Sequence, residues 1–108
     1  MNGLDMEKLL SLQSELQEKY KNKWGSLMPE KAKNMLLWLV GEVGEVADII
    51  KKNGDKMILS NSNTRGHFIE EMADVMMYFC DVLLCYGITA EEFERVYLEK
   101  HDENMNRW

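Results

Sequence analysis

The sequence has little of what stabilises a disulfide-linked or β-sheet protein. Its 108 residues include one Pro and two Cys. Cys80 and Cys85 lie on different faces of one expected helix, so they cannot pair with each other within it. We therefore expect two buried thiols in a reducing, cytoplasmic compartment. Runs of β-branched residues and strict apolar/polar alternation are also scarce, so no strands are expected.

Positive charge and long apolar runs are scarce as well. The 13 Lys and Arg against 19 Asp and Glu give a formal net charge of -6, which argues against a nucleic-acid partner. Asp74 and Asp81 interrupt the most apolar stretch, residues 72–88, and charges interrupt residues 1–20, so neither a membrane span nor a signal peptide is expected. Because 45% of the residues are hydrophobic, we expect one folded domain over residues 1–108.

Apolar residues at helical spacing predict an all-α, four-helix, bundle-like domain. The first helix is expected to begin after an N-cap at Asp5 and to end near Trp24. The second is expected to begin at Pro29, which suits a first helical turn, and to stop at Asn53–Gly54.

The second half of the chain predicts a loop and two more helices. Residues 55–66 have little periodicity and predict a long loop of the kind that forms a lid. The third helix is expected from about His67 to Tyr86. A capping box of Thr89 and Glu92 predicts a fourth helix that reaches the C-terminus.

The third helix is unusual because both of its sides are apolar. One side carries Phe68, Val75, Tyr78 and Val82, and the other carries Met72, Met76, Cys80, Leu83 and Leu84. Such a helix is either the central helix of its domain or part of a buried interface between copies. We expect a homo-oligomer, a dimer or a tetramer, that completes the fold.

Two pairs of carboxylates lie among these apolar positions. Glu42 and Glu45 fall within the apolar stripe of the second helix, and Glu71 and Asp74 are in phase with Tyr78 on the third. Because unpaired ionised carboxylates are costly at an apolar interface, their convergence predicts a bound cation. All-oxygen ligands suit Mg²⁺ or Mn²⁺, and the sequence lacks the Glu-x-x-His motif of di-iron bundles.

Further residues suit a phosphate-bearing ligand. Mg²⁺ held by few protein ligands normally bridges to phosphates, which indicates phosphoryl chemistry. Lys100, Asn104 and Arg107 follow at i, i+4 and i+7 near the C-terminus, where they either bind phosphate or offset the helix dipole. Trp24 and Trp38 are either packing residues or platforms for a base, and we include them as candidates for substrate binding.

Three motifs resemble those of the MazG-like nucleoside triphosphate pyrophosphohydrolases over about residues 24–108. They are Glu42-Val-Gly-Glu45, Glu71-Met-Ala-Asp74 and Lys100-x-x-x-Asn104-x-x-Arg107. The resemblance implies an all-α fold related to the dimeric dUTPases, Mg²⁺ dependence, and hydrolysis of an NTP or dNTP to the monophosphate and pyrophosphate.

The resemblance also implies roles for these residues. Glu42, Glu45, Glu71 and Asp74 look like the metal ligands and catalytic residues. Lys100 and Asn104 look like contacts to phosphate or to the shell of the metal, and Arg107 looks like a substrate contact. Many relatives have two adjacent Glu where this chain has Gly41-Glu42, so either the carboxylate that helps to activate water is missing here or Glu42 combines both roles. One of the four carboxylates is expected to accept the proton from water.

The alternative hypothesis is a protein without catalytic activity. It would be a helical oligomer that binds a nucleotide or a partner protein and holds a structural metal ion in the acidic cluster. Turnover of a nucleoside triphosphate separates the two hypotheses.

Overall fold

The computed structural model describes residues 3–108, so the first two residues of the expected domain lie outside the described part. The described residues form helices and no strand, which confirms the all-α prediction. In chain order these elements are α1 (Met6–Lys19), α2 (Lys21–Trp24), the short 3-10 helix η1 (Pro29–Lys31), α3 (Ala32–Ser60), α4 (Ser62–Cys85) and α5 (Ala90–Met105).

Local capping chemistry begins two of the helices as expected. The Asp5 carboxylate accepts a hydrogen bond of 2.8 Å from the Lys8 amide at the start of α1. Thr89 and Glu92 form the predicted capping box of α5, with hydrogen bonds of 3.1 and 3.2 Å.

The predicted loop over residues 55–66 is wrong. Gly54 leaves the helical conformation at φ 80° and ψ 162°, but the chain turns back into helix and α3 continues to Ser60. Asn61 then caps α4 by accepting a hydrogen bond of 3.0 Å from the Thr64 amide. Gly54 therefore kinks α3 where a stop was expected, α4 begins before His67, and no lid is present in this segment.

The first predicted helix is also interrupted. Tyr20 has φ -107° and ψ 16°, which divides the expected helix into α1 and the single turn α2. Trp24 remains at its end, and the Tyr20 and Trp24 rings lie 4.7 Å apart across the break.

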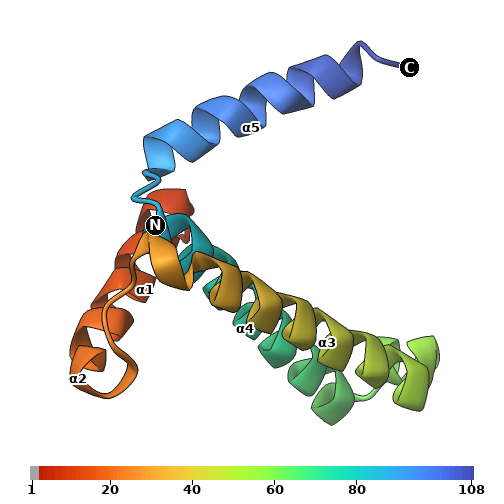
Figure 1. The fold of residues 1–108 in the computed structure, drawn as a ribbon. Helices are drawn as coiled ribbons and strands as arrows, with labels where there is room; N and C mark the ends of the chain where they lie inside the picture. Colours follow the sequence, from red (N-terminus) through yellow and green to blue (C-terminus); the bar gives the residue numbers. More distant parts are fainter. Residues whose placement is uncertain (1–2) are drawn as a thin grey trace.

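The helices form limbs that diverge from one region (Figure 1). α3 and α4 pack side by side as one limb, and α1 packs against α4 and leaves at an angle to it. The limbs meet at a core of Leu10, Cys80 and Leu83, against which Phe79 and Phe93 pack. Both Cys80 and Cys85 are buried and free, as expected.

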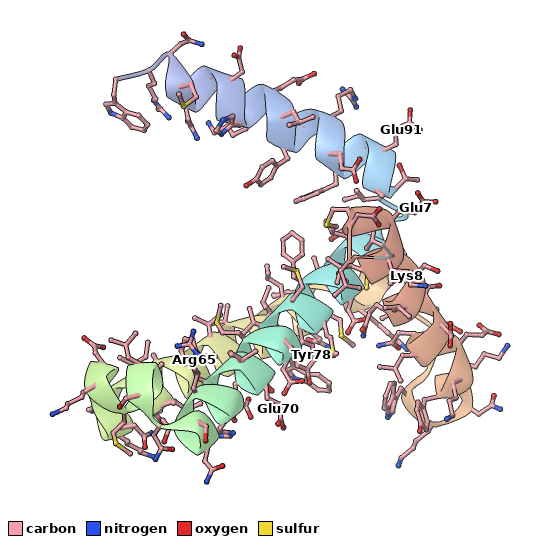
Figure 2. All side chains as sticks on the ribbon, turned by 180° about the vertical axis from the view of Figure 1, so that it is seen from behind. Glu7, Lys8, Arg65, Glu70, Tyr78 and Glu91 are labelled. Carbon is pink, nitrogen blue, oxygen red and sulfur yellow. The ribbon has the colours of Figure 1, made fainter. Side chains whose placement is uncertain are left out.

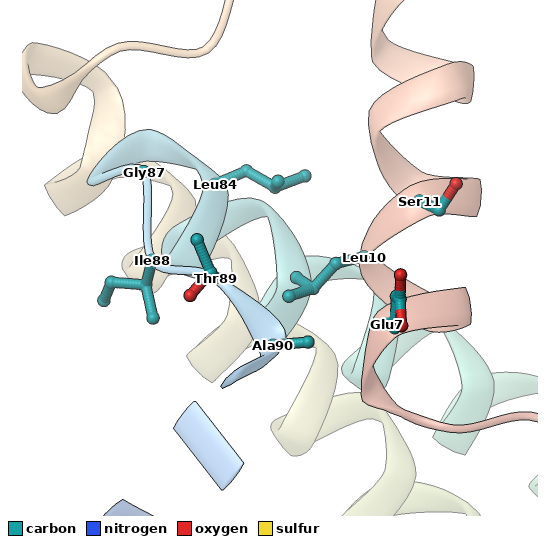
Figure 3. Close-up of a pocket in the computed structure, with 8 residues that line it drawn as sticks. All are labelled: Glu7, Leu10, Ser11, Leu84, Gly87, Ile88, Thr89 and Ala90. Atoms are coloured by element: carbon teal, nitrogen blue, oxygen red, sulfur yellow. The ribbon is translucent and has the colours of Figure 1, made fainter. Parts of the chain in front are cut away.

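The α5 helix projects away from the other helices (Figures 1 and 2). Among the described elements its backbone comes close only to α1, and Phe93 packs edge to face on Phe79 at 5.5 Å. Figure 3 shows the joint, where Leu10 of α1 points toward the turn between Leu84 and Ala90 and the surrounding residues line a hollow of about 310 Å³. Residues 94–103 of α5 are exposed to solvent.

The result is an extended molecule. Its radius of gyration is 16.3 Å, whereas a compact domain of this length has roughly 13 Å. On α4 the Met72 and Met76 side chains are 46% and 42% exposed, so a single chain does not bury this helix on all sides.

No single helix in residues 3–108 is long and apolar enough to cross a membrane. Only α4 and α5 taken together, which are bent by 111° relative to each other, have the length and the apolar composition of a span.

The kink in α3 gives a test of the fold. At Gly54 the backbone lies in a region that only glycine adopts readily, so Gly54→Ala should lower the free energy of unfolding by about 1–3 kcal/mol. The matched control is Gly66→Ala, inside α4 with open space at the added Cβ, which should raise it by up to about 1 kcal/mol. Urea unfolding at one protein concentration measures both. A neutral Gly54→Ala would mean that α3 runs straight through this position.

Candidate functional site

Three carboxylates converge where α3 packs on α4. Glu42 and Glu45 of α3 and Glu71 of α4 each offer an oxygen, and these oxygens lie within 4.8 Å of one another. We call these residues the carboxylate cluster. Helical spacing places Asp74 one turn along α4 from Glu71, half-buried. The two helices therefore bring together three of the four acidic residues that the sequence singled out, and the fourth, Asp74, lies beside Glu42 in the wall of the same pocket.

Burial and charge repulsion both disfavour the ionised form of the carboxylate cluster. Burial raises the pKa of Glu42 to about 7, helped by its hydrogen bond with Glu45 and by the nearby charges of Glu71 and Asp74. Within the described residues, Glu42 Oε2 is buried and accepts no hydrogen bond. A shielded carboxylate oxygen without a donor, beside two other carboxylates, is an arrangement that a cation stabilises.

The donor set fits a hard divalent cation. The oxygens of Glu42, Glu45 and Glu71 would hold it, with Asp74 next to them, and Mg²⁺ and Mn²⁺ prefer such all-oxygen ligands. Glu45 is exposed whereas Glu42 and Glu71 are half-buried, so the cluster opens to solvent on one side. That open side is where a ligand's phosphates can approach.

A pocket of about 630 Å³ adjoins the cluster between α1 and the α3–α4 limb. Glu42 and Asp74 belong to its wall, and so do the aromatic side chains of Trp24, Trp38 and Tyr78. Trp38 and Tyr78 meet edge to face with ring centroids 6.2 Å apart, and Trp38 is 58% exposed. The structure thus brings both candidate tryptophans to one pocket with two of the carboxylates. In Figure 2, Tyr78 lies on the side of α4 toward α1.

The same pocket contains polar residues that the sequence analysis missed. Asp81 is buried, and its Oδ1 accepts hydrogen bonds from Gln13 Nε2 at 2.9 Å and Gln17 Nε2 at 3.1 Å. The spacing in the sequence could have placed Asp81 in the site, because Asp81 follows Asp74 by two helical turns and lies on the same face of the helix. In the sequence alone, Asp81 stands out only as a charge that interrupts an apolar stretch.

The C-terminal residues lie apart from the cluster within one chain. Lys100 and Asn104 belong to α5, whose backbone does not approach α3 or α4, and Lys100 pairs with Glu103 at 3.6 Å. Arg107 lies past the end of α5, with its guanidinium 5.3 Å from the Trp108 ring. The predicted single helical face therefore does not extend to Arg107, because the helix ends at Met105.

The fold and the site define an all-α protein with a carboxylate cluster built on two packed helices beside an aromatic pocket. Residues 30–105 match the family model of the MazG nucleotide pyrophosphohydrolase domain. The chain belongs to this family. The comparisons found no match among curated proteins and none among solved structures.

The raised pKa of Glu42 predicts how stability depends on pH. Between its ordinary value of 4.5 and about 7, the folded state holds a proton that the unfolded state releases. Without metal, the free energy of unfolding should therefore fall as the pH rises through this range. The pKa of Asp81, raised by burial, acts in the same direction.

Glu42→Gln isolates the contribution of the cluster. The variant keeps the side-chain shape without the titrating group, so its pH dependence should be shallower and its stability at pH 8 equal to or above that of the wild type. Thermal melts from pH 5 to pH 8 in a chelator measure both proteins. Identical slopes would show that Glu42 titrates in the folded protein as it does in the unfolded chain.

Proposed function

We propose that this chain is a Mg²⁺-dependent nucleoside triphosphate pyrophosphohydrolase. It would convert an NTP or dNTP and water to the monophosphate and pyrophosphate, a reaction suited to clearing nucleotides from the cellular pool. The observation that carries the proposal is the carboxylate cluster at the edge of the aromatic pocket, joined to it by Glu42. The family of the chain supports the same reaction class.

The pocket and the carboxylate cluster would bind different parts of the nucleotide. Trp24, Trp38 and Tyr78 offer aromatic faces and edges to a nucleobase, which places the phosphates toward Glu42 and Asp74. A bound Mg²⁺ would neutralise phosphate charge and acidify a bound water. Mn²⁺ suits the same ligands.

One of the carboxylates would also accept the proton of the attacking water. Glu42 belongs to both the carboxylate cluster and the wall of the pocket, so its carboxylate lies where it could take the proton of a water that attacks a bound phosphate. Water attacks phosphorus, the bond to the leaving oxygen breaks, and the proton passes to a carboxylate and then to solvent.

We further propose that the working form is a homo-oligomer in which a second copy supplies α5. The cluster and its pocket contain four more acidic residues than basic ones, because Glu42, Glu45, Glu71, Asp74 and Asp81 are accompanied by Lys23 alone. The cationic row of the same chain lies on α5, away from that site. The outer faces of α4 and α5 expose Met72, Met76, Val96 and Leu98. A second copy that covers these residues also brings Lys100 and Asn104 within reach of the acidic site.

Hydrolysis tests the activity. Purified protein with each common NTP and dNTP should release pyrophosphate only when Mg²⁺ or Mn²⁺ is present. Glu42→Gln and Glu71→Gln should each lower kcat/KM by at least about 100-fold, because each removes a ligand from the charged centre. Mg²⁺ should raise the melting temperature of the wild type and raise that of the variants less.

Glu94→Gln is the matched control, since Glu94 is exposed on α5 outside the cluster and the pocket. It should keep the wild-type rate and the full Mg²⁺ shift. Nucleotide binding without pyrophosphate release from any substrate would favour the non-catalytic alternative. Wild-type hydrolysis by both Gln variants would remove the cluster from the mechanism.

Mixed oligomers test whether α5 acts on a second copy. Glu42→Gln and Lys100→Ala should each be inactive as homo-oligomers. If they are unfolded and refolded together in equal amounts, about a quarter of the sites should regain an intact Glu42 and Lys100 from different chains, and hydrolysis should recover to about that fraction. No recovery, with mixed oligomers present by mass, would place both residues in the same chain's site.

Light scattering tests whether the exposed surface of α4 is the interface between copies. Met72→Lys with Met76→Lys should shift the protein toward monomer and lower hydrolysis, whereas Ser60→Lys, at the far end of α3, should leave the assembly intact. An active wild-type monomer would contradict the oligomer proposal.

A further inference from the structure

A second group of polar residues, Gln13, Gln17 and Asp81, lies in the pocket away from the carboxylate cluster. We call it the polar cluster. Gln13 is 6% exposed and Asp81 is 3% exposed, so the cluster is almost fully removed from solvent. Asp81 lies two helical turns, roughly 10 Å, along α4 from Asp74. This separation is similar to that between the phosphates and the base edge of a nucleotide, and all three residues line the pocket.

The hydrogen bonds fix which atoms remain for a ligand. Gln13 and Gln17 both donate through Nε2 to Asp81 Oδ1, so their amide oxygens point away from that carboxylate oxygen. Turning either amide over would set two acceptor oxygens against each other. Among the described residues, no donor is hydrogen-bonded to either amide oxygen or to Asp81 Oδ2. The cluster therefore presents acceptors to whatever enters the pocket.

Resting on the function proposed above, we propose that this cluster selects a nucleobase with an amine at the position of cytosine N4 or adenine N6. Uracil and thymine present a carbonyl oxygen in place of cytosine N4, and guanine presents one in place of adenine N6. The amine would donate to the acceptors of Gln13, Gln17 or Asp81. A carbonyl in the same place would leave these buried acceptors unpaired and face a carboxylate.

The cluster also has a structural role, because its hydrogen bonds join α1 to α4. A purely structural role affects all nucleotides equally, since it acts through the shape of the whole pocket. Base reading affects the ratio between amino and keto nucleotides. The ratio is therefore the quantity to measure.

The experiment compares kcat/KM for dCTP and dUTP in the presence of Mg²⁺. The wild type should favour dCTP by at least about tenfold, the effect of one discriminating hydrogen-bond pair. Asp81→Asn has nearly the same size, and its oxygen can still accept from both glutamines while its amide group donates toward the ligand. It should lower the dCTP/dUTP ratio by at least about tenfold. The control Asp55→Asn, on an exposed residue beyond the α3 kink, should keep the wild-type ratio.

A binding measurement separates this inference from the activity. Calorimetry with dCMP and dUMP requires no turnover, and the wild type should bind dCMP more tightly. Gln17→Leu changes the half-buried member of the cluster and should reduce the same preference, which covers the case in which Asp81→Asn fails to fold. Tighter dCMP binding without hydrolysis of any triphosphate would support base reading and contradict the enzyme.

Two results would overturn the inference. Hydrolysis of dCTP and dUTP at equal kcat/KM would leave the enzyme standing and remove the cluster from specificity. Failure to bind either monophosphate and to hydrolyse any triphosphate would overturn both proposals. An unchanged ratio in a folded Asp81→Asn or Gln17→Leu variant would assign the cluster to joining α1 and α4 only.

Discussion

Repulsion among carboxylates at the α3–α4 interface is the constraint on which the rest of the structure depends. Val46 and Ile49 are buried on α3, and this packing fixes the distance between the two helices. Because Glu42 lies on the same apolar stripe, the packing also brings it close to Glu71. The like charges can be relieved by a proton on Glu42, whose pKa is near 7, or by a cation. Packing energy thus holds the cluster in a state that either a proton or a cation would stabilise.

The excess of negative charge at the site and the exposed apolar surface of the chain both depend on where α5 lies. Lys23 is the single basic residue among those lining the pocket. The row that begins at Lys100 lies on a helix that contacts the rest of the molecule mainly through its first turns. A helix that exposes Val96 and Leu98 to water gains little from standing alone. In the homo-oligomer that we propose, another copy would both cover this apolar surface and supply positive charge to the cluster.

Local sequence signals predicted the features that local interactions decide. The caps at Asp5 and Thr89 and the shared face of Glu42 and Glu45 follow from helical geometry and side-chain hydrogen bonding. The loop prediction failed at Gly54 because a glycine can either end a helix or kink it. Only the course of the chain after Gly54, where the helix resumes, distinguishes a helix end from a kink.

Features that depend on tertiary packing could not be predicted in the same way. The position of α5 depends on what covers its apolar residues, and helical periodicity does not specify that. Asp81 was missed for a related reason, since a lone Asp in an apolar helix has no assigned role until its partners are known. Its partners, Gln13 and Gln17, come from a helix more than 60 residues away, as the sequence separations of 68 and 64 show.

The buried polar cluster also explains why α1 belongs to the site. Helix α1 packs on α4 and not along α3, so the width of the pocket depends on how α1 is held against α4. Leu10 anchors one end of α1 in the core, and the hydrogen bonds to Asp81 fix the next turns. A buried carboxylate without a cationic partner is costly, and both glutamine donors are needed to offset that cost. The hydrogen bonds that stabilise Asp81 in the interior also orient the amide groups of Gln13 and Gln17. If these groups read the base as proposed, stability and base selection are coupled through the same bonds.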